Sequence, residues 1–175
     1  MNLFSIPVVV GNVDLKKIKL TNEKFDKLWI SKTKSSYAGR NVLNKNGKKH
    51  LADVFSKLLS EIIYNPFEFY VTGIWENIYN KKDFQEPHVH GNSHFSFIIY
   101  KDVKKSNTVF FHPAKNLLQL AHHNLNIFDE QVIPSLKKGQ VILFPSYVEH
   151  MVLKSTNQKT ISGNITVKIT GKNSV

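Results

Sequence analysis

Three histidines have the type and spacing to do chemistry. His88 and His90 stand one residue apart, and His150 follows sixty residues later, each beside an apolar, β-rich run. In a strand, residues i and i+2 project from the same face, so His88 and His90 are predicted to point the same way. Imidazoles that hold a cation from one side leave its other side open to reactants, as a non-haem iron centre requires. We therefore predict a metal site and catalytic centre at these three histidines.

The elements that must position these histidines are strands. From residue 67 onward, aromatic and β-branched runs alternate with short turns, which is typical of a sandwich or jelly roll. The sequence predicts strands over 67–79, 95–100, 108–112, 131–133, 139–145, 150–153 and 160–169. The segment 114–126 is rich in Leu and His and is expected to form a short helix or an excursion over the site.

The N-terminal third has a different pattern. Residues 3–10 are predicted to form a strand, and a helix is expected to open at Thr21 or Asn22. The polar segment 35–49 is predicted to be a loop, and 51–63 keeps a helical apolar stripe until Asn65-Pro66. We therefore expect one domain over 1–175. Its N-terminal strand and two helices (1–66) would pack on a β core (67–170), giving a mainly β fold with N-terminal helices.

Composition excludes several classes of protein and site. There is no Cys, so a metal would need His, carboxylate or carbonyl ligands. No apolar run has the length of a membrane span, and the first ten residues lack a signal-peptide pattern, which together predict a cytoplasmic protein. The net charge is +11, but the Lys residues are dispersed and Arg40 is the only arginine, so nucleic-acid binding is not favoured.

A wider set of residues resembles a known family. The pattern Trp75-x-Asn77, Pro87-His88-x-His90, Gly139-x4-Phe144-Pro145-Ser146, His150 and Ile161-Ser162-Gly163-Asn164 resembles the 2-oxoglutarate/Fe(II)-dependent oxygenase superfamily. It is most similar to small oxygenases of tailed phages that are distantly related to prolyl 4-hydroxylases. The similarity covers about residues 70 to 169, and for a phage protein the location would be the cytoplasm of the bacterial host.

This resemblance implies a fold, cofactors and site residues. The fold would be a double-stranded β-helix, the jelly roll that cupins also have. The cofactors would be Fe(II), the co-substrate 2-oxoglutarate and O2. His88 and His150 would be iron ligands, and Lys159 would bind the distal carboxylate of 2-oxoglutarate with help from Tyr100, Thr160 or Ser162. Asn77 and Asn164 would line the pocket and hydrogen-bond the co-substrate.

One position departs from the family pattern. The usual ligand set is His-x-Asp/Glu with a distal His, whereas His90 stands where the carboxylate is expected. We interpret His90 as the replacement ligand, which makes the iron centre one unit more positive. Two alternatives remain open: water completes the set, or a carboxylate does so, with Glu86 better placed than Glu149 because it shares strand parity with His88.

The same histidines also resemble the two cupin motifs. In that comparison His94 stands in the usual Glu position and becomes a candidate fourth ligand, while His112, His122 and His123 are interpreted as structural or surface residues. The cupin resemblance keeps the fold and weakens the cofactor assignment.

The expected activity is hydroxylation of a C–H bond in a peptidyl, prolyl-like substrate or a small molecule, with release of succinate and CO2. The alternatives are a cupin-type metalloenzyme that does not use 2-oxoglutarate, a non-catalytic jelly-roll binding or virion module, and, less favoured, a demethylase acting on nucleic acid. Homodimer formation is a further expectation, because a small jelly roll exposes strand edges.

Overall fold

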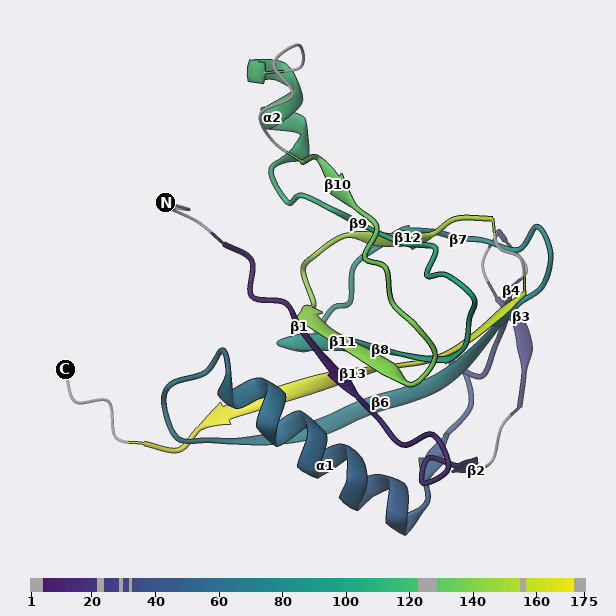
Figure 1. Cartoon of the computed structure of the whole chain (residues 1–175), viewed down its shortest axis with the longest axis vertical. Helices are drawn as coiled ribbons and strands as arrows, with labels where there is room; N and C mark the ends of the chain where they lie inside the picture. The colour runs from purple at the N-terminus through teal and green to yellow at the C-terminus, as the bar shows by residue number, and fades with distance from the viewer. Residues whose placement is uncertain are drawn as a thin grey trace.

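Two large antiparallel sheets and one two-stranded sheet form the described part of the computed structural model, which covers residues 5–21, 24–28, 30–31, 33–122, 129–154 and 157–171. The larger sheet contains, in spatial order, β1 (Val9–Asn12), β11 (Gln140–Pro145), β8 (Phe95–Asp102), β13 (Gln158–Ile169), β6 (Phe67–Tyr79), β4 (Thr33–Ser35) and β3 (Asp26–Leu28). The smaller sheet contains β10 (Gln131–Val132), β9 (Thr108–Phe111), β12 (His150–Val152) and β7 (Gln85–His88). The two sheets form separate layers (Figure 1), which confirms the jelly-roll prediction.

The larger sheet presents a different face to each neighbouring layer. Along its central strands, Phe97, Ile99 and Ile161 pack with the helix α1 (Lys45–Ser60) in one apolar core. The residues between them in sequence, such as Ile98 and Tyr100, belong to a second core between the two sheets. Successive side chains of a strand point to opposite faces, so parity decides which layer each residue enters.

The helix α1 covers the outer face of the larger sheet (Figure 1). Its buried residues Leu51, Phe55, Leu58 and Leu59 recur at helical spacing, as the apolar stripe predicted. The Phe55 ring is fully buried and lies 4.7 Å, centroid to centroid, from the Phe97 ring of β8. Burial of this stripe fixes the helix to the sheet.

The helix begins at Lys45, earlier than the sequence predicts. Asn46-Gly47, which lies in the segment predicted to be a loop, forms part of its first turn. A Cβ on Gly47 would lie 2.5 Å from Asn44 Oδ1 and 3.0 Å from the Leu43 side chain, so only glycine fits there. The Asn44 side chain is in turn occupied in accepting a hydrogen bond from the Lys19 backbone N–H at 3.0 Å. Here glycine permits close packing and does not mark a turn.

The predicted helix after Thr21 is wrong. Asp26–Leu28 forms the edge strand β3, which pairs antiparallel with β4, while residues 22, 23 and 29 lie outside the described residues. The polar segment 35–49 also contributes structure: Val42–Leu43 forms β5, which pairs with β2 (Leu20–Thr21). Pairing with β4, which itself pairs with β6, recruits β3 into the larger sheet, whereas β2 and β5 form a separate two-stranded sheet. Long-range pairing of β3 thus overrides a weak local helical pattern.

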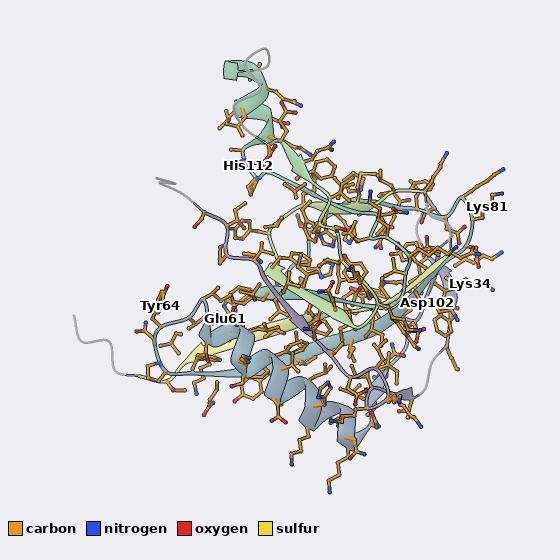
Figure 2. All side chains as sticks on the ribbon, in the orientation of Figure 1. Lys34, Glu61, Tyr64, Lys81, Asp102 and His112 are labelled. Atoms are coloured by element: carbon orange, nitrogen blue, oxygen red, sulfur yellow. The ribbon has the colours of Figure 1, made fainter. Side chains whose placement is uncertain are left out.

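The remaining predicted strands are confirmed to within two residues, apart from the first. Residues 1–4 lie outside the described residues, and β1 is confined to Val9–Asn12. The segment after β9 forms the helix α2 (Lys115–His122), which projects away from the two sheets (Figure 1). His112 lies at the base of this projection (Figure 2). Its Nδ1 accepts a hydrogen bond from the Ala114 backbone at 3.0 Å, which agrees with a structural role. No helix in the described ranges is long and apolar enough to cross a membrane.

Candidate metal centre and co-substrate pocket

The three predicted histidines converge between the sheets. His88 on β7 and His150 on β12 are register partners in the smaller sheet. His90 follows β7, where its backbone N–H donates to the Ser146 carbonyl at 3.0 Å. One ring nitrogen from each histidine lies within 4.8 Å of the other two, and in the described part of the chain this is the group of potential ligands that could hold a metal ion.

Each imidazole has a fixed hydrogen-bond partner at Nδ1. The His88 Nδ1 contacts the Glu86 carbonyl at 2.7 Å, and the His150 Nδ1 contacts the Val148 carbonyl at 3.1 Å. The His90 Nδ1 contacts Asn164 Oδ1 at 2.6 Å. Because these partners accept hydrogen bonds, each Nδ1 carries the proton and each Nε2 presents its lone pair, which is a tautomer that can bind a metal through Nε2.

Burial keeps the three imidazoles neutral. Desolvation lowers the pKa of His88 and of His90, and it lowers the pKa of His150 well below its ordinary value. For His150, which is only 3% exposed, repulsion from the other two imidazoles acts in the same direction. Neutral imidazoles with free Nε2 atoms are suitable ligands for Fe(II), so the residues present fit the ion that the family implies.

Two hollows meet at the histidines. The outer cleft has a volume of about 430 Å³ and is lined by His88, His90, Asn164 and several apolar or aromatic side chains, among them Ile30, Tyr37, Trp75 and Pro87. The inner cavity, of about 20 Å³, has room for a single water. It is lined by the three histidines and by Trp75, Asn77, Tyr79, Gln85, Ile98, Thr108, Val152, Thr160 and Ser162. The three histidines therefore separate an open cleft from a small polar cavity.

Several residues predicted for the co-substrate line the inner cavity. Asn77 and Ser162 face it from β6 and β13, and Asn77 Nδ2 donates to Ser162 Oγ at 3.3 Å. Tyr100 stands one layer behind, with its hydroxyl donating to Thr108 Oγ1 at 3.0 Å. The structure thus brings Asn77, Ser162 and Tyr100 to the same side of the histidines.

Asn164 lines the outer cleft and not the inner cavity. Its Oδ1 accepts the short hydrogen bond from His90, and Ser96 Oγ lies 2.9 Å from the same His90 nitrogen. Two further serines continue this network, with Ser146 Oγ 2.9 Å from Ser96 Oγ and 2.8 Å from Ser93 Oγ. In this structure Asn164 orients the imidazole of His90, which stands in the sequence where the family pattern has a carboxylate.

The predicted position of Lys159 is wrong. Lys159 is exposed and opposes Ile78 across the β13–β6 pair, whereas its buried neighbour Thr160 opposes Asn77. Thr160 and Asn77 both line the inner cavity, so Lys159 projects from the opposite face. It lies opposite Asp102 of β8, which Figure 2 shows with Lys34 at one end of the larger sheet.

The alternative ligands do not join the histidines. Glu86 accepts a hydrogen bond from the Ser31 backbone at 2.8 Å, and Glu149 forms an ion pair with Lys115. His94 is exposed, and its Nδ1 accepts a hydrogen bond from the Val167 backbone at 3.0 Å. The group of convergent ligands contains none of these three, so the suggestion of His94 as a fourth ligand is wrong.

Sequence reasoning gave no cavity role to Gln85, Thr108 or Tyr79, and named Thr160 only as an assistant to Lys159. Gln85 accepts a hydrogen bond from the Tyr79 hydroxyl at 2.6 Å, and its Nε2 lies 3.3 Å from His88 Nε2. The available signal was strand parity, because Thr160, Ser162 and Asn164 alternate with Lys159 along one strand. Nothing in the sequence marks Gln85, because its position depends on the pairing of β7 with β12.

Comparison with known proteins identifies the family of this chain. A family model described as "Putative 2OG-Fe(II) oxygenase" matches residues 73–163, which is more than half of the chain. The chain belongs to the 2OG-Fe(II) oxygenase family. It is therefore a 2-oxoglutarate- and Fe(II)-dependent oxygenase, as the sequence motifs predict. No curated protein matches it in a sequence search.

Solved structures of this family have the same fold. HygX from Streptomyces hygroscopicus, with nickel, 2-oxoglutarate and hygromycin B bound, superposes with a TM-score of 0.56 at 11% identity, over 92% of this chain and 83% of HygX. The viral collagen prolyl hydroxylase of Paramecium Bursaria Chlorella virus-1, in complex with 2-oxoglutarate, gives 0.51 at 10% identity, over 89% and 98%. A 2OG-Fe(II) family oxidoreductase from Burkholderia pseudomallei gives 0.53 at 10% identity, over 91% and 68%. At such identities these likenesses establish the fold of this oxygenase.

Proposed function

We propose that this oxygenase hydroxylates a C–H bond of a peptidyl, prolyl-like substrate, with Fe(II) held by His88, His90 and His150. In this reaction one oxygen atom of O2 enters the substrate and the other enters succinate, while 2-oxoglutarate loses CO2. Bound iron would supply the oxidising chemistry, and the protein supplies three neutral ligands on one side of it.

The observation that carries this proposal is the common tautomer of the three imidazoles. Each Nδ1 donates to an acceptor fixed by the fold, the carbonyls of Glu86 and Val148 and the amide of Asn164. Each Nε2 is therefore left to bind metal without reorientation of the ring. Histidines with only a packing role would not need three converging Nε2 lone pairs in one buried cluster.

The surrounding side chains would orient the substrate and exclude water. Phe144 and Phe110 pack against the His150 ring, with centroids at 4.9 Å and 5.8 Å. Trp75 lies 5.6 Å from the His90 ring and meets Tyr37 edge-on at 4.9 Å. Trp75 and Tyr37 thus form an apolar wall of the outer cleft, while Phe144 and Phe110 shield the His150 ring from water.

The lining of the outer cleft favours a prolyl-like side chain. Trp75, Tyr37 and Pro87 offer flat apolar surfaces of the kind on which proline rings pack, and the volume of about 430 Å³ suits one ring with flanking backbone. The structurally similar viral enzyme is named a collagen prolyl hydroxylase, which supports the same class. A small-molecule substrate is the second candidate, supported by the cleft volume and by HygX, which was solved with hygromycin B bound.

The first experiment is an anaerobic titration of the metal-free protein with Fe(II) and then 2-oxoglutarate. The wild type is expected to bind one Fe(II) per chain and to develop the visible charge-transfer band of chelated 2-oxoglutarate. His150→Ala should weaken Fe(II) binding by about 100-fold or more, because it removes a ligand and not only a supporting hydrogen bond. His94→Ala is the matched control, since that imidazole is exposed and bonded to the β13 backbone.

Admission of O2 with proline-rich peptides then tests the substrate class. The expected result is succinate release together with one added oxygen atom in the peptide, detected by mass spectrometry. Oxygen transfer to a small molecule but to no peptide would change the proposed substrate class from peptide to small molecule and would leave the proposed hydroxylation reaction intact. Equal iron affinity of the wild type and His150→Ala would contradict the proposed metal centre.

A further inference from the structure

The inner cavity beyond the histidines has no cation. Among the described residues, no lysine or arginine lines either hollow at the metal site. Lys159, the expected partner of the distal carboxylate, lies exposed on the other face of β13. The cavity nevertheless contains polar groups whose hydrogen-bonding capacity is incomplete.

Thr108 ends a chain of hydroxyl donors that runs toward the cavity. Ser106 Oγ donates to the Tyr100 hydroxyl at 3.2 Å, and that hydroxyl donates to Thr108 Oγ1 at 3.0 Å. With its oxygen accepting from Tyr100, the Thr108 hydroxyl has its own proton left to donate into the cavity that it lines. A chain of polarised hydroxyls of this kind strengthens its last donor.

On the facing strand, β13 contributes groups without partners. Thr160 is 3% exposed, lines the cavity and forms no side-chain hydrogen bond with the described residues. Gln158 is 2% exposed and shares its face of the strand, and neither atom of its amide has a partner in the described structure. Asn77 Oδ1 is also buried and unpaired. Buried polar groups are costly to leave unsatisfied, so the unpaired Asn77 Oδ1 and the unbonded Thr160 hydroxyl, which both belong to residues that line the cavity, favour a polar ligand there.

We propose that the distal carboxylate of the 2-oxo acid co-substrate is held by uncharged donors, the hydroxyls of Thr160 and Thr108, and not by a lysine. This inference rests on the proposed function and defines how the same site recognises its co-substrate. The Gln85 and Asn77 side chains must rotate to admit the ligand, because the cavity holds about 20 Å³. Iron at His88 Nε2 would displace Gln85 Nε2 from its contact there and free that side chain to move.

Charge balance explains how a cation can be absent. In the usual arrangement a dication is bound by one carboxylate, and a separate cation pairs with the distal end of the co-substrate. Here the third ligand is the neutral His90 and the distal residue is the neutral Thr160. The total charge that faces the dianionic co-substrate is the same, but all of it is placed on the metal. Coulomb attraction in a buried site acts over the length of 2-oxoglutarate. Placing the positive charge on the metal therefore preserves the net attraction, while the hydroxyl donors fix the position of the distal carboxylate.

The test measures 2-oxoglutarate affinity of the iron-loaded protein under anaerobic conditions, by the charge-transfer band and by calorimetry. Thr160→Val is expected to weaken 2-oxoglutarate binding by about tenfold or more, the worth of one hydrogen bond to a charged group. Thr160→Ser keeps the hydroxyl and should restore most of the affinity. Lys159→Ala should change the affinity less than about twofold, as expected for an exposed charge. Fe(II) binding alone serves as the folding control for the Thr160 and Lys159 variants.

A second set of variants tests whether the neutral ligand His90 compensates for the absence of a cation at the distal carboxylate. His90→Asp adds a negative charge at the metal and should weaken 2-oxoglutarate binding by about tenfold. Adding Thr160→Lys to His90→Asp should recover that loss, so the two substitutions should couple favourably in a double-mutant cycle. Should the double variant fail to fold, Thr108→Val with Thr160→Val gives an independent test by loss of both hydroxyls.

The outcomes separate the two proposals. A loss of tenfold or more in Lys159→Ala with no loss in Thr160→Val would overturn the uncharged pocket and leave the proposed function intact. Wild-type protein that binds Fe(II) but no 2-oxoglutarate would overturn the proposed function, and the inference with it.

Discussion

The two faces of the larger sheet are built from the same strands but have opposite chemistry. On the outer face, Phe97, Ile99 and Ile161 pack against α1 in a dry apolar core. On the inner face, their neighbours Ser96, Thr160 and Ser162 surround the histidines and the small polar cavity. One residue of displacement along a strand therefore separates the stabilising layer from the reactive layer.

This separation allows the inner face to remain polar and incompletely bonded. The outer core buries large apolar side chains such as Phe55 and Phe97, so it can offset the cost of unpaired polar atoms inside. The unpaired buried atoms of the described residues include three inner-face atoms, in Asn77 and Gln158, and one near the loop after β4, in Asn41. We therefore expect substitutions on the outer face to change stability and substitutions on the inner face to change ligand binding.

The largest effect on the outer face is expected from Phe55→Ala. Its fully buried ring contacts Phe97, and truncating such a residue leaves a cavity. The free energy of unfolding should fall by about 3–5 kcal/mol, measured by urea denaturation. Fe(II) affinity of the fraction that remains folded should stay within about twofold of the wild type. A parallel loss of metal affinity would contradict the independence of the two faces.

On the inner face, Asn164→Leu should affect iron binding more than stability. The substitution removes the acceptor that fixes the His90 tautomer, and loss of such a supporting group typically weakens metal affinity by about 10–100-fold. Asn164→Asp is the matched control, since a carboxylate accepts the same hydrogen bond and should keep tight Fe(II) binding. If leucine and aspartate behave alike, Asn164 has only a packing role.

The smallest effect is the acid sensitivity of the metal-free protein. The pKa of His150 is lowered in the folded state, so below its ordinary value near 6.5 the unfolded chain binds more protons than the folded one. The contribution of His150 to the free energy of unfolding is therefore fully present above that pH, and it is lost as the pH falls toward the pKa of His150 in the folded state. His150 alone should lower the free energy of unfolding by about 0.7 kcal/mol between pH 7 and pH 6. His88 and His90 act in the same direction.

Denaturation curves at several pH values check this prediction, with His150→Ala as the comparison. The variant should show a shallower decrease in stability over the same interval, because one buried imidazole is missing. An identical slope in both proteins would assign the acid sensitivity to other groups.

The sequence by itself determined the strands from residue 67 onward and the three histidines. The alternation of apolar and polar residues and the i, i+2 spacing of His88 and His90 are local properties of the sequence. They therefore do not depend on the order of the strands in the sheet. The apolar stripe of α1 was predicted for the same reason. The start of the helix was not predicted, because Gly47 is typical of a turn, whereas here it allows close packing against Leu43.

Only the tertiary structure decided which face of β13 meets the histidines. Register against β6 places Thr160 opposite Asn77 and turns Lys159 outward, and no local pattern fixes a register made across about eighty residues of chain. The same holds for β3, which becomes a strand through its pairing with β4, and for Asn164, whose contact with His90 joins two distant segments. Local periodicity sets which elements form, whereas long-range pairing sets which of their side chains reach the site.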